Sequence, residues 1–221
     1  MSLVVVIPTL NAAATLAATL RALDGCGQVV VADGGSTDGT VSLARQAGAT
    51  VVAAPPGRGP QLAAGAASTT EEWLLFLHAD TRLGAGWRDA VERFIRDPAN
   101  TTRAGYFPLH LDSDHPAARR VERMAAWRAG MLGLPYGDQG LLIARRFYEE
   151  IGGYRSLPLM EDVDLVRRIG RARLRALPAE AETSAVRYER DGWWLRPMRN
   201  LACLSLYFAG VPPRVIRKLY G

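Results

Sequence analysis

The chain has almost no lysine, few cysteines and no long apolar run, and the last two scarcities argue against particular classes of protein. Of its 27 basic residues only Lys218 is a lysine, which leaves 27 − 1 = 26 arginines. Cys26 and Cys203 lie far apart and outside any Cys-x-x-Cys pair, which argues against a zinc or redox site, so we expect both to be small buried apolar residues. No stretch reaches the roughly 18 uncharged apolar residues that a membrane-spanning helix needs.

Two nucleotide-binding motifs are also missing. The Gly-x-x-x-x-Gly-Lys-Ser/Thr loop of ATPases is absent, and the first predicted strand is followed by Pro8-Thr-Leu-Asn11 instead of the Gly-x-Gly-x-x-Gly of dinucleotide-binding dehydrogenases. These absences argue against both enzyme classes. The N-terminus has no basic region and no small-residue cleavage site before Pro8, so we expect no signal peptide and a cytoplasmic protein.

What the sequence does contain is the composition of an ordinary globular domain. Its 221 residues are 48% hydrophobic, 22% charged and 8% aromatic, which argues against a disordered, collagen-like or coiled-coil chain. The net charge of +5 and the pI near 9.6 favour anionic partners. That class includes phosphorylated small molecules and acidic membrane surfaces as well as nucleic acids, so charge alone does not choose among them.

The first half of the chain alternates between strand and helix patterns. Residues 3–7 form a β-branched run that Pro8 ends, which is typical of a strand buried on both faces. The pattern continues with a helix for which Asn11 is a candidate cap, a strand at 29–32, a helix to Ala47 capped by Thr37 or Asp38, and a strand at 50–53. This order predicts an α/β/α sandwich with a mostly parallel sheet and a ligand beyond the carboxyl ends of its strands.

The later segments extend one domain. They predict a loop at 55–60, a helix at 61–68, the strongest strand at 73–78 and a helix at 87–95. A strand at 103–111, an arginine-rich helix at 116–132 and a short strand at 140–144 follow. We expect residues 1–100 to form a nucleotide-binding half, residues 101–190 an acceptor half and residues 191–221 a helical annex. The C-terminal helices either pack on the domain or contact a membrane peripherally.

A glycine-rich segment, Asp33-Gly-Gly-Ser-Thr-Asp-Gly39, follows the second predicted strand. Its glycines let the backbone approach a ligand closely, and Asp33 can accept hydrogen bonds from a base or a ribose. The alternative interpretation is a tight turn in which Asp38 caps the next helix.

The segment His78-Ala79-Asp80 closes the strongest strand. Residues i and i+2 of a strand point to the same face, so the His78 ring and the Asp80 carboxylate emerge together. One carboxylate suits Mg²⁺ or Mn²⁺, which takes its remaining ligands from phosphates and water. Alternatively, Asp80 caps a turn and His78 is a hydrogen-bonded histidine near the core. Two arginines, Arg58 and Arg187, can reach a phosphate or remain solvated charges.

The segment 160–170 is the most informative part of the second half. Helical spacing places Asp162, Leu165, Val166 and Ile169 on an inward face. It places Asp164, Arg167, Arg168 and Arg171 on the outward face. An inward carboxylate at the mouth of a sheet is placed for general-base catalysis. The alternative role of Asp162 is stabilisation of the helix N-terminus through the helix dipole.

Together these motifs resemble a known family. Their order and spacing are similar to those of the family 2 glycosyltransferases, which have the GT-A fold, a Rossmann-like α/β/α sandwich, and the resemblance covers most of the chain. It also extends to a short bacterial branch with a His-Ala-Asp metal motif, sometimes labelled as arsenosugar-biosynthesis or carotenoid-acid glycosyltransferases. The segments that carry it are Val4-Val-Val-Ile-Pro-Thr-Leu-Asn11, Val30-Val-Ala-Asp-Gly-Gly-Ser-Thr-Asp-Gly-Thr40, Leu75-Phe-Leu-His-Ala-Asp80, Gly137-Asp-Gln-Gly140 and Pro158-Leu-Met-Glu-Asp-Val-Asp164.

The resemblance implies a role for each matching residue. Asp80 would bind the divalent cation, Mn²⁺ or Mg²⁺, on the diphosphate of the sugar nucleotide. Asp162 would be the catalytic base, with Glu161 beside it. The residues that would bind the nucleotide sugar are Pro8, Thr9, Asn11, Asp33, Arg58, His78, Ala79 and Asp80, and those on the acceptor or phosphate side are Asp138, Gln139 and Arg187. The chain departs from the family where His78 replaces the first Asp of the metal motif and Gly34 replaces the second Asp of an Asp-Asp pair.

The predicted function is therefore an inverting transfer of a sugar from a nucleotide-diphosphate sugar, expected to be UDP-linked, to a hydroxyl or carboxyl group of a small-molecule or lipid acceptor, without nucleic acid. A sugar-1-phosphate nucleotidyltransferase is an alternative, although such enzymes have a Gly-rich basic loop where Pro8-Thr-Leu-Asn11 stands. A non-catalytic basic module that binds anions is the other alternative. It explains the pI but not the acidic residues at the strand ends.

Overall fold

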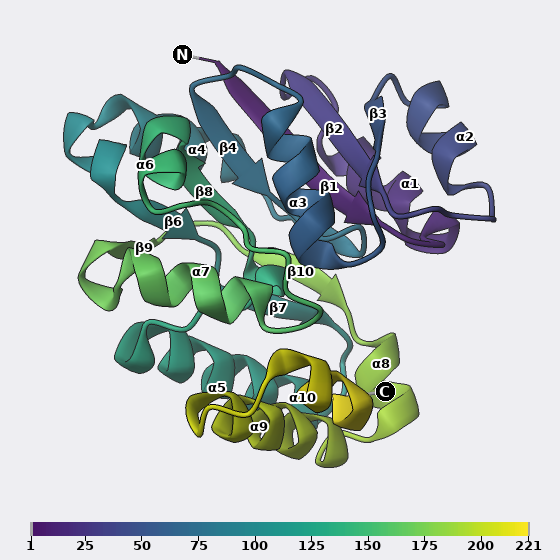
Figure 1. The fold of residues 1–221 in the computed structure, drawn as a ribbon, viewed down its shortest axis with the longest axis vertical. Coiled ribbons are helices and arrows are strands. Elements are labelled where there is room, and N and C mark those ends of the chain that lie inside the picture. The colour runs from purple at the N-terminus through teal and green to yellow at the C-terminus, as the bar shows by residue number, and fades with distance from the viewer. Residues whose placement is uncertain (1, 221) are drawn as a thin grey trace.

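A seven-stranded sheet carries the fold of residues 2–220, the part of the chain that the computed structural model describes (Figure 1). Strand β8 is antiparallel to its neighbours β4 and β6, and the other neighbours pair in parallel, so the sheet is mostly parallel as predicted. The strands follow the order β3 (Thr50–Ala53), β2 (Gln28–Asp33), β1 (Leu3–Thr9), β4 (Trp73–Phe76), β8 (Leu141–Ala144), β6 (Ala104–Tyr106) and β9 (Leu174–Ala176).

The centre of the sheet is also the centre of the core. Residues Val4 to Ile7 of β1 are fully buried, as the β-branched run predicts for a strand covered on both faces. The chain order reverses at β1, because β2 and β3 lie on one side of it and β4 on the other. In open α/β sheets such a reversal opens a crevice at the carboxyl ends of the strands, which is where ligands bind.

Helices surround this sheet. Trp73 of β4 and Phe94 of α4 meet edge to face with ring centroids 6.0 Å apart, which fixes one of these helices on the sheet. The helices are α1 (Ala13–Ala22), α2 (Thr40–Gln46), α3 (Arg58–Ala67), α4 (Trp87–Arg96), α5 (Pro116–Leu132), α6 (Arg145–Glu150), α7 (Glu161–Ile169), α8 (Val186–Asp191), α9 (Leu195–Phe208) and α10 (Pro213–Tyr220), with short 3-10 turns at Pro98–Thr102, Gly137–Gln139 and Arg171–Arg173.

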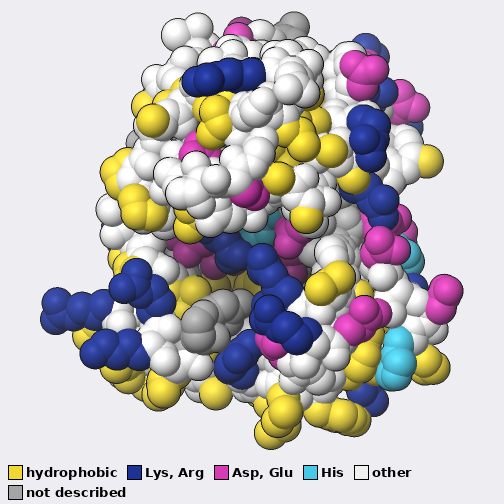
Figure 2. All heavy atoms as spheres, turned by 90° about the vertical axis from the view of Figure 1, so that its right-hand side faces the viewer, with side chains coloured by type: hydrophobic (Ala, Val, Ile, Leu, Met, Phe, Trp, Pro, Cys, Tyr) yellow, Lys and Arg dark blue, Asp and Glu magenta, His cyan; other side chains and the backbone are white. Residues whose placement is uncertain are grey.

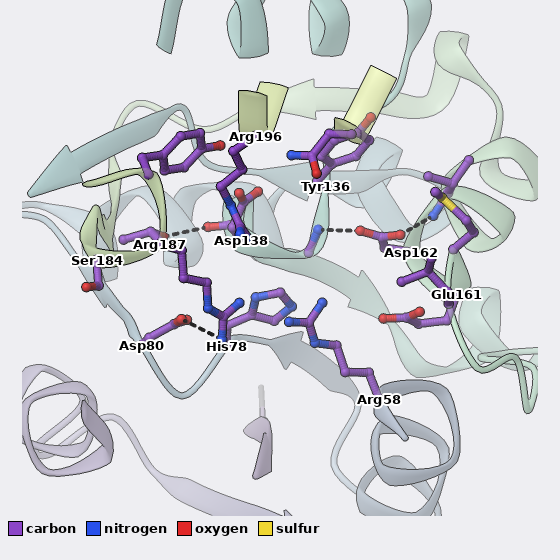
Figure 3. A pocket seen from close by; sticks show the side chains of 17 residues that line it. Arg58, His78, Asp80, Tyr136, Asp138, Glu161, Asp162, Ser184, Arg187 and Arg196 are labelled. Atoms are coloured by element: carbon purple, nitrogen blue, oxygen red, sulfur yellow. Dashed lines mark hydrogen bonds and ion pairs between the residues drawn. The ribbon is translucent and has the colours of Figure 1, made fainter. Parts of the chain in front are cut away.

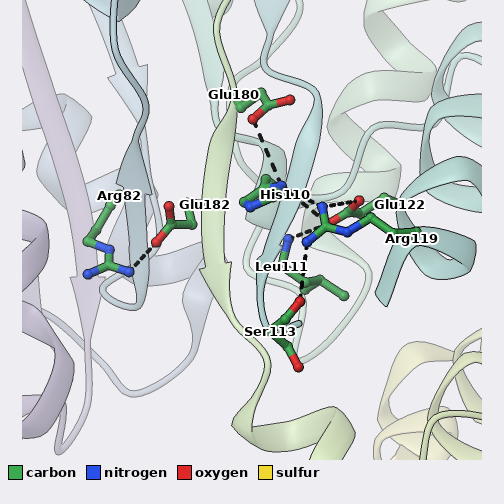
Figure 4. Close-up of polar contacts among 8 residues, drawn as sticks. All are labelled: Arg82, His110, Leu111, Ser113, Arg119, Glu122, Glu180 and Glu182. Carbon is green, nitrogen blue, oxygen red and sulfur yellow. Dashed lines mark hydrogen bonds and ion pairs between the residues drawn. The ribbon is translucent and has the colours of Figure 1, made fainter. Parts of the chain in front are cut away.

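A second, three-stranded sheet supports α5. It has the order β5 (Thr81–Leu83), β10 (Ala181–Ser184) and β7 (Leu109–Asp112). Glu122 of α5 accepts a hydrogen bond from the backbone N–H of Leu111, 2.7 Å away, and pairs with Arg119 at 2.7 Å (Figure 4). An Arg82–Glu182 ion pair joins β5 to β10 on the same sheet. The helix is thereby held against β7 by a polar network.

Several predicted elements have different boundaries in the structure. Strand β1 continues past Pro8 to Thr9, and β4 ends at Phe76, so His78 and Asp80 follow that strand and do not close it. The strand predicted at 103–111 is two strands, because the chain leaves the large sheet after Tyr106 and joins the small one at Leu109, with Pro108 between them. The helix predicted at 61–68 begins at Arg58. Arg58 therefore lies in the first turn of α3 and not in a glycine loop, while Gly57 precedes it at φ 127°, a conformation that favours glycine.

The predicted cap of α1 is wrong. Helix α1 begins at Ala13, and Asn11 lies before it in the left-handed region at φ 50°. Asp38 contributes to both neighbouring helices, because Oδ2 accepts from the backbone N–H of Ala13 at 3.1 Å and Oδ1 from that of Thr40 at 3.0 Å. The prediction that Thr37 or Asp38 caps α2 is wrong, because Gly39 occupies the cap position, although Asp38 still accepts from the first N–H of that helix.

The C-terminal helices pack on the domain and also leave apolar side chains outside. Cys203 and Leu204 of α9 and Ile216 of α10 are buried, whereas Leu195, Leu201 and Leu219 are largely exposed. Cys203 is buried as predicted, and Cys26 is half-buried. None of the helices within residues 2–220 has the length and apolar character needed to cross a bilayer.

The packing of α3 on β1 depends on Gly65, and this generates a stability prediction. A Cβ at Gly65 would lie 2.4 Å from Cγ1 of Val6, so we expect Gly65→Ala to lower the free energy of unfolding by about 1–3 kcal/mol through overpacking. Gly130 is the matched control, because it is exposed within α5 and a Cβ there meets nothing within 4 Å. Gly130→Ala should leave stability unchanged or raise it by about 0.5–1 kcal/mol. Urea unfolding measures both, and equal effects of the two substitutions would refute the packing argument.

Candidate functional site

A cavity lies beyond the carboxyl ends of the central strands, where the reversal at β1 predicts one. Figure 2 shows acidic, basic and histidine side chains gathered in a hollow of the surface. Its lining combines polar residues from both halves of the chain, namely Arg58, His78, Asp80, Tyr136, Asp138, Glu161, Asp162, Thr183, Ser184, Arg187, Tyr188, Arg196 and Asn200, with Gly137, Leu159, Met160 and Val163. In Figure 3, Asp80 and Asp162 lie on opposite sides of the cavity, with His78 and Asp138 between them.

The Asp33 side chain organises the loop after β2. Its Oδ1 accepts hydrogen bonds from the hydroxyls of Thr9 (2.9 Å) and Ser36 (2.6 Å), and its Oδ2 from the backbone N–H groups of Gly35 (3.0 Å) and Ser36 (2.8 Å). Burial would raise the pKa of Asp33, but these hydrogen bonds outweigh it and hold the pKa below its ordinary value. Asp33 is thus an ionised anchor for the loop, and its contact with a base or ribose stays a prediction.

Gln61 is a buried residue that the sequence did not single out. Its side-chain amide donates to the backbone carbonyls of Thr9 and Ala32, so helix α3 holds the ends of β1 and β2 together. Asn11 adds a second link between the two loops, because its backbone N–H donates to the Ser36 hydroxyl at 2.8 Å. The sequence does contain a signal that could have identified Gln61 as a buried link, because it is a polar residue on the inward side of a predicted helix.

His78 packs closely against Gly137. A Cβ at Gly137 would lie 2.5 Å from Nε2 of His78, so only glycine leaves room for the ring. Burial, and then the positive charge of Arg58, lower the pKa of His78 to about 3, although Asp80 opposes the shift. The imidazole is therefore neutral at neutral pH. The backbone carbonyl of Ala79 accepts a hydrogen bond from the Thr19 hydroxyl at 3.0 Å, which fixes the turn between His78 and Asp80.

Asp80 has an arginine as its charged partner. Nη2 of Arg187 lies 3.6 Å from Oδ2 of Asp80, and the backbone carbonyl of Asp80 accepts from the N–H of Ser184 at 3.2 Å. Within residues 2–220 no three His, Cys, Asp or Glu side chains come together as a metal site. A single carboxylate open to a cavity still fits Mg²⁺ or Mn²⁺, because these ions take most of their ligands from phosphates and water.

The two acids at the start of α7 occupy different environments. Oδ2 of Asp162 accepts from the backbone N–H of Gly137 at 2.9 Å and Oδ1 from that of Val163 at 2.7 Å, which orients the side chain toward the cavity. Glu161 is buried, and burial, followed by the negative charge of Asp162, raises its pKa to about 7. Met160 precedes them at φ 65°, an uncommon conformation for a non-glycine residue.

The outward face predicted for α7 is wrong for one acid. Asp164 is buried, because its carboxylate pairs with Arg168 one turn later at 2.7 Å and with Arg155 at 3.1 Å. Arg168 also donates to the backbone carbonyls of Ile151 and Gly153. This network ties α7 to the loop before it and so supports the positions of Glu161 and Asp162.

The Gly137-Asp-Gln-Gly140 segment splits between site and scaffold. Asp138 lines the cavity, its Oδ1 is buried without a hydrogen-bond partner among residues 2–220, and burial raises its pKa. Gln139 is fully buried away from the cavity. Its amide donates to the carbonyl of Phe107 at 3.1 Å and accepts from Arg128 at 3.2 Å. The structure therefore corrects the prediction for Gln139, which is a scaffold residue.

The remaining predicted residues divide into two groups. Arg58, His78, Arg187 and the acids meet in the cavity. The predicted residues that do not line it are Pro8 and Thr9 at the end of β1, Asn11, Asp33 at the end of β2, and Ala79. Sequence reasoning missed the aromatic and C-terminal part of the lining, namely Tyr136, Tyr188, Arg196 and Asn200. Tyr136 directly precedes the Gly137-Asp-Gln-Gly140 segment. No local motif marks Tyr188, Arg196 and Asn200, because they reach the cavity only when α8 and α9 fold back onto it.

Comparison with solved structures identifies similar folds. Glucosyl-3-phosphoglycerate synthase from Mycobacterium tuberculosis, solved with Mn²⁺, UDP and glucosyl-3-phosphoglycerate, is 19% identical, with a TM-score of 0.56 over 83% of this chain and 70% of that one. S. aureus TarS (residues 1–349), solved with UDP-GlcNAc, is 15% identical, with a TM-score of 0.61 over 83% of this chain and 58% of that one. These likenesses establish the GT-A fold that was predicted.

Sequence comparison establishes the family. No curated protein sequence matches the chain. A family model described as Glycosyl transferase family 2 matches residues 4–151, which is more than half of the chain and runs from β1 through the Asp80 turn to the end of α6. The resemblance of the motifs, the GT-A fold and this match agree, and the chain belongs to glycosyl transferase family 2.

Proposed function

We propose that this protein transfers a sugar from a UDP-sugar to an acceptor by a single inverting displacement, with Asp162 as the base. The observation that carries the proposal is the arrangement of two carboxylates in one cavity. Asp80 lies on the side of the donor loops and Asp162 on the side of the second half of the chain, and both line the cavity (Figure 3). One carboxylate can hold a cation against the leaving diphosphate while the other activates the attacking group.

The donor would occupy the cavity edge next to the β1 and β2 loops. The M. tuberculosis synthase and TarS are described with UDP and UDP-GlcNAc, respectively, which supports a uridine nucleotide as the donor carrier. Here the Asp33 loop is held by hydrogen bonds before any ligand arrives, and Arg58 and Arg187 lie beside the path to Asp80. Arginines bind phosphates well because the guanidinium group donates charge-assisted hydrogen bonds to them.

Asp80 would hold a divalent cation together with the diphosphate and water. The synthase is described with Mn²⁺ and, in another structure, with Mg²⁺ and UDP, which supports this choice of ion. When bound, the cation would neutralise the charge that develops on the departing diphosphate. Nη2 of Arg187 lies 3.6 Å from Oδ2 of Asp80, so the arginine is close enough to bind the same diphosphate as the cation.

Asp162 is better placed than Glu161 to act on an acceptor. Both oxygens of Asp162 accept backbone hydrogen bonds and face the cavity, so the carboxylate is aimed without being sealed from a ligand. Glu161 is buried, and its raised pKa of about 7 keeps it largely protonated below neutral pH. An in-line attack needs only one base and no covalent intermediate, so the second acid is free to serve as support.

Substitution of the base should affect turnover more than donor binding. We expect Asp162→Asn to lower the rate of UDP release from UDP-sugars by about 10²- to 10⁴-fold, the usual contribution of a positioned base. Calorimetry with UDP and Mn²⁺ should show nearly the same affinity as for the unmodified chain. Asp89→Asn, an exposed substitution on α4, is the control. Near-normal turnover of Asp162→Asn would remove Asp162 from this role.

Substitution of Asp80 should uncouple the cation from the nucleotide. We expect UDP to bind the unmodified chain more tightly with Mn²⁺ than without it, and we expect Asp80→Ala to abolish that difference because the cation loses its protein ligand. Titration calorimetry with and without Mn²⁺ measures the difference directly. Asp114→Ala, at an exposed position before α5, is the control. A Mn²⁺ dependence that survives in Asp80→Ala would contradict the assignment.

A further inference from the structure

A second cavity opens beside the first and has the opposite chemistry. It runs between α5 and α9 and has a volume of about 150 Å³. Leu109, Val121 and Leu204 form buried parts of its lining, and Met124, Trp127, Leu132 and Leu201 are walls that are half-exposed or more. We refer to this cavity as the apolar groove.

The apolar groove meets the candidate active site. Four residues, Tyr136, Asp138, Tyr188 and Asn200, line both cavities. A molecule that fills the groove therefore has one end at the junction and next to the acids. Soluble proteins rarely leave so many large apolar side chains uncovered without a use for them.

The junction lacks polar partners that a ligand could supply. Oδ1 of Asp138 and Oδ1 of Asn200 are buried side-chain oxygens with no hydrogen-bond partner in the described part of the chain. Buried oxygens of this kind are costly, and they are normally satisfied by protein, water or ligand. An unpaired oxygen accepts hydrogen bonds, and both residues line the junction, so a ligand group that satisfies either oxygen donates a hydrogen bond, as a hydroxyl does.

We propose that the apolar groove binds the hydrocarbon chain of the acceptor, whose hydroxyl-bearing head lies at Asp138 and Asn200. This inference rests on the proposed function, because it identifies the acceptor of that reaction as an amphiphile. The groove selects the hydrocarbon chain by burial, while the junction selects a head with hydroxyl donors. An amphiphile accounts for both the apolar lining of the groove and the two unpaired oxygens at the junction. A folded protein partner on α5 and α9 would leave the two buried oxygens unpaired.

The test uses a defined probe, an undecanol chain with a terminal dansyl group, whose fluorescence rises in an apolar site. We expect it to bind the full chain, and we expect a hexanol analogue to bind at least about tenfold more weakly, because each buried methylene contributes up to roughly fourfold. Leu201→Gln should weaken binding by roughly ten- to a hundredfold, the contribution of a buried leucine side chain. Leu195→Gln is the matched control, since Leu195 is also an exposed leucine of α9 but does not line the groove.

Binding of UDP with Mn²⁺ to the same samples separates this proposal from the proposed function. If UDP binds and the probe does not, or if Leu201→Gln and Leu195→Gln act alike, the groove proposal is overturned while the donor site stands. If the probe binds with the expected selectivity and UDP does not bind, the groove remains an amphiphile site and glycosyl transfer is refuted. Thermal unfolding confirms that both variants are folded.

The distribution of charge carries a second proposal independently. Residues 192–221 contain five basic residues and no acidic one, namely Arg196, Arg199, Arg214, Arg217 and Lys218. The rest of the chain has 27 − 5 = 22 basic residues against 22 acidic residues and is neutral. Arg196 and Arg199 both pair with Asp191, so the exposed basic cluster is Arg214, Arg217 and Lys218 of α10.

This basic cluster lies beside exposed apolar side chains. Val215 and Leu219 of α10 and Leu195 and Met198 of α9 are exposed. Figure 2 shows Lys and Arg side chains in the lower part of the view, above hydrophobic side chains at the bottom edge. Basic and apolar side chains together suit an interface with anionic lipids. We infer that α9 and α10 dock on an anionic bilayer, which would place the mouth of the apolar groove near the source of an amphiphile.

Sedimentation with vesicles tests the docking. We expect the protein to bind vesicles of phosphatidylcholine with phosphatidylglycerol but not phosphatidylcholine alone, and to be released by salt. The triple substitution Arg214→Gln, Arg217→Gln and Lys218→Gln should weaken binding about a hundredfold, at about 1 kcal/mol for each charge. The control removes three exposed arginines elsewhere, Arg21, Arg45 and Arg93. Equal losses in the two triple variants, or no preference for anionic vesicles, would overturn the proposal.

Discussion

The crowding of acidic side chains in one cavity is the constraint on which the rest of the site depends. Four acids line it, namely Asp80, Asp138, Glu161 and Asp162. Like charges in partly buried surroundings disfavour one another's ionised forms, so each acid needs a cation, a backbone donor or a proton. Arg187 pairs with Asp80, backbone N–H groups donate to Asp162, and burial favours the protonated form of Glu161. The fold thus meets the same electrostatic cost in three different ways.

Close backbone approaches make that arrangement possible. Gly137 allows the His78 ring to lie against it, and its N–H group is also the donor that orients Asp162. At Gly59 a Cβ would lie 2.3 Å from the carbonyl oxygen of Arg155, so the start of α3 and the loop before α7 are in direct contact. These two glycines bring residues from three distant parts of the sequence to one edge of the sheet. Larger side chains there would move the start of α3 and the His78 turn away from Asp162.

The sequence was most informative where the local pattern of residues and the tertiary packing favour the same secondary structure and the same placement of a residue. The β-branched run at 3–7, the helix at 116–132 and the acids at strand ends were predictable because hydrophobic period and parallel topology determine them. The burial of Asp164 was not, because it depends on pairing with Arg155 and Arg168 across a loop. The apolar groove was likewise hidden, since its walls come from α5 and α9, which lie far apart in the chain and meet only after folding.

The loop after β2 and the junction of the two cavities differ in how their polar groups are satisfied. The oxygens of Asp33 have four protein donors, so the protein alone holds that loop in place. At the junction with the apolar groove, Asp138 and Asn200 keep buried oxygens that have no hydrogen-bond partner among residues 2–220. A ligand that lacks hydroxyl donors leaves them unpaired, at about 1–3 kcal/mol for each group, whereas a hydroxylated ligand removes the cost. Under the proposed function, discrimination among acceptors would reside at this junction, where the apolar groove meets the acids of the first cavity.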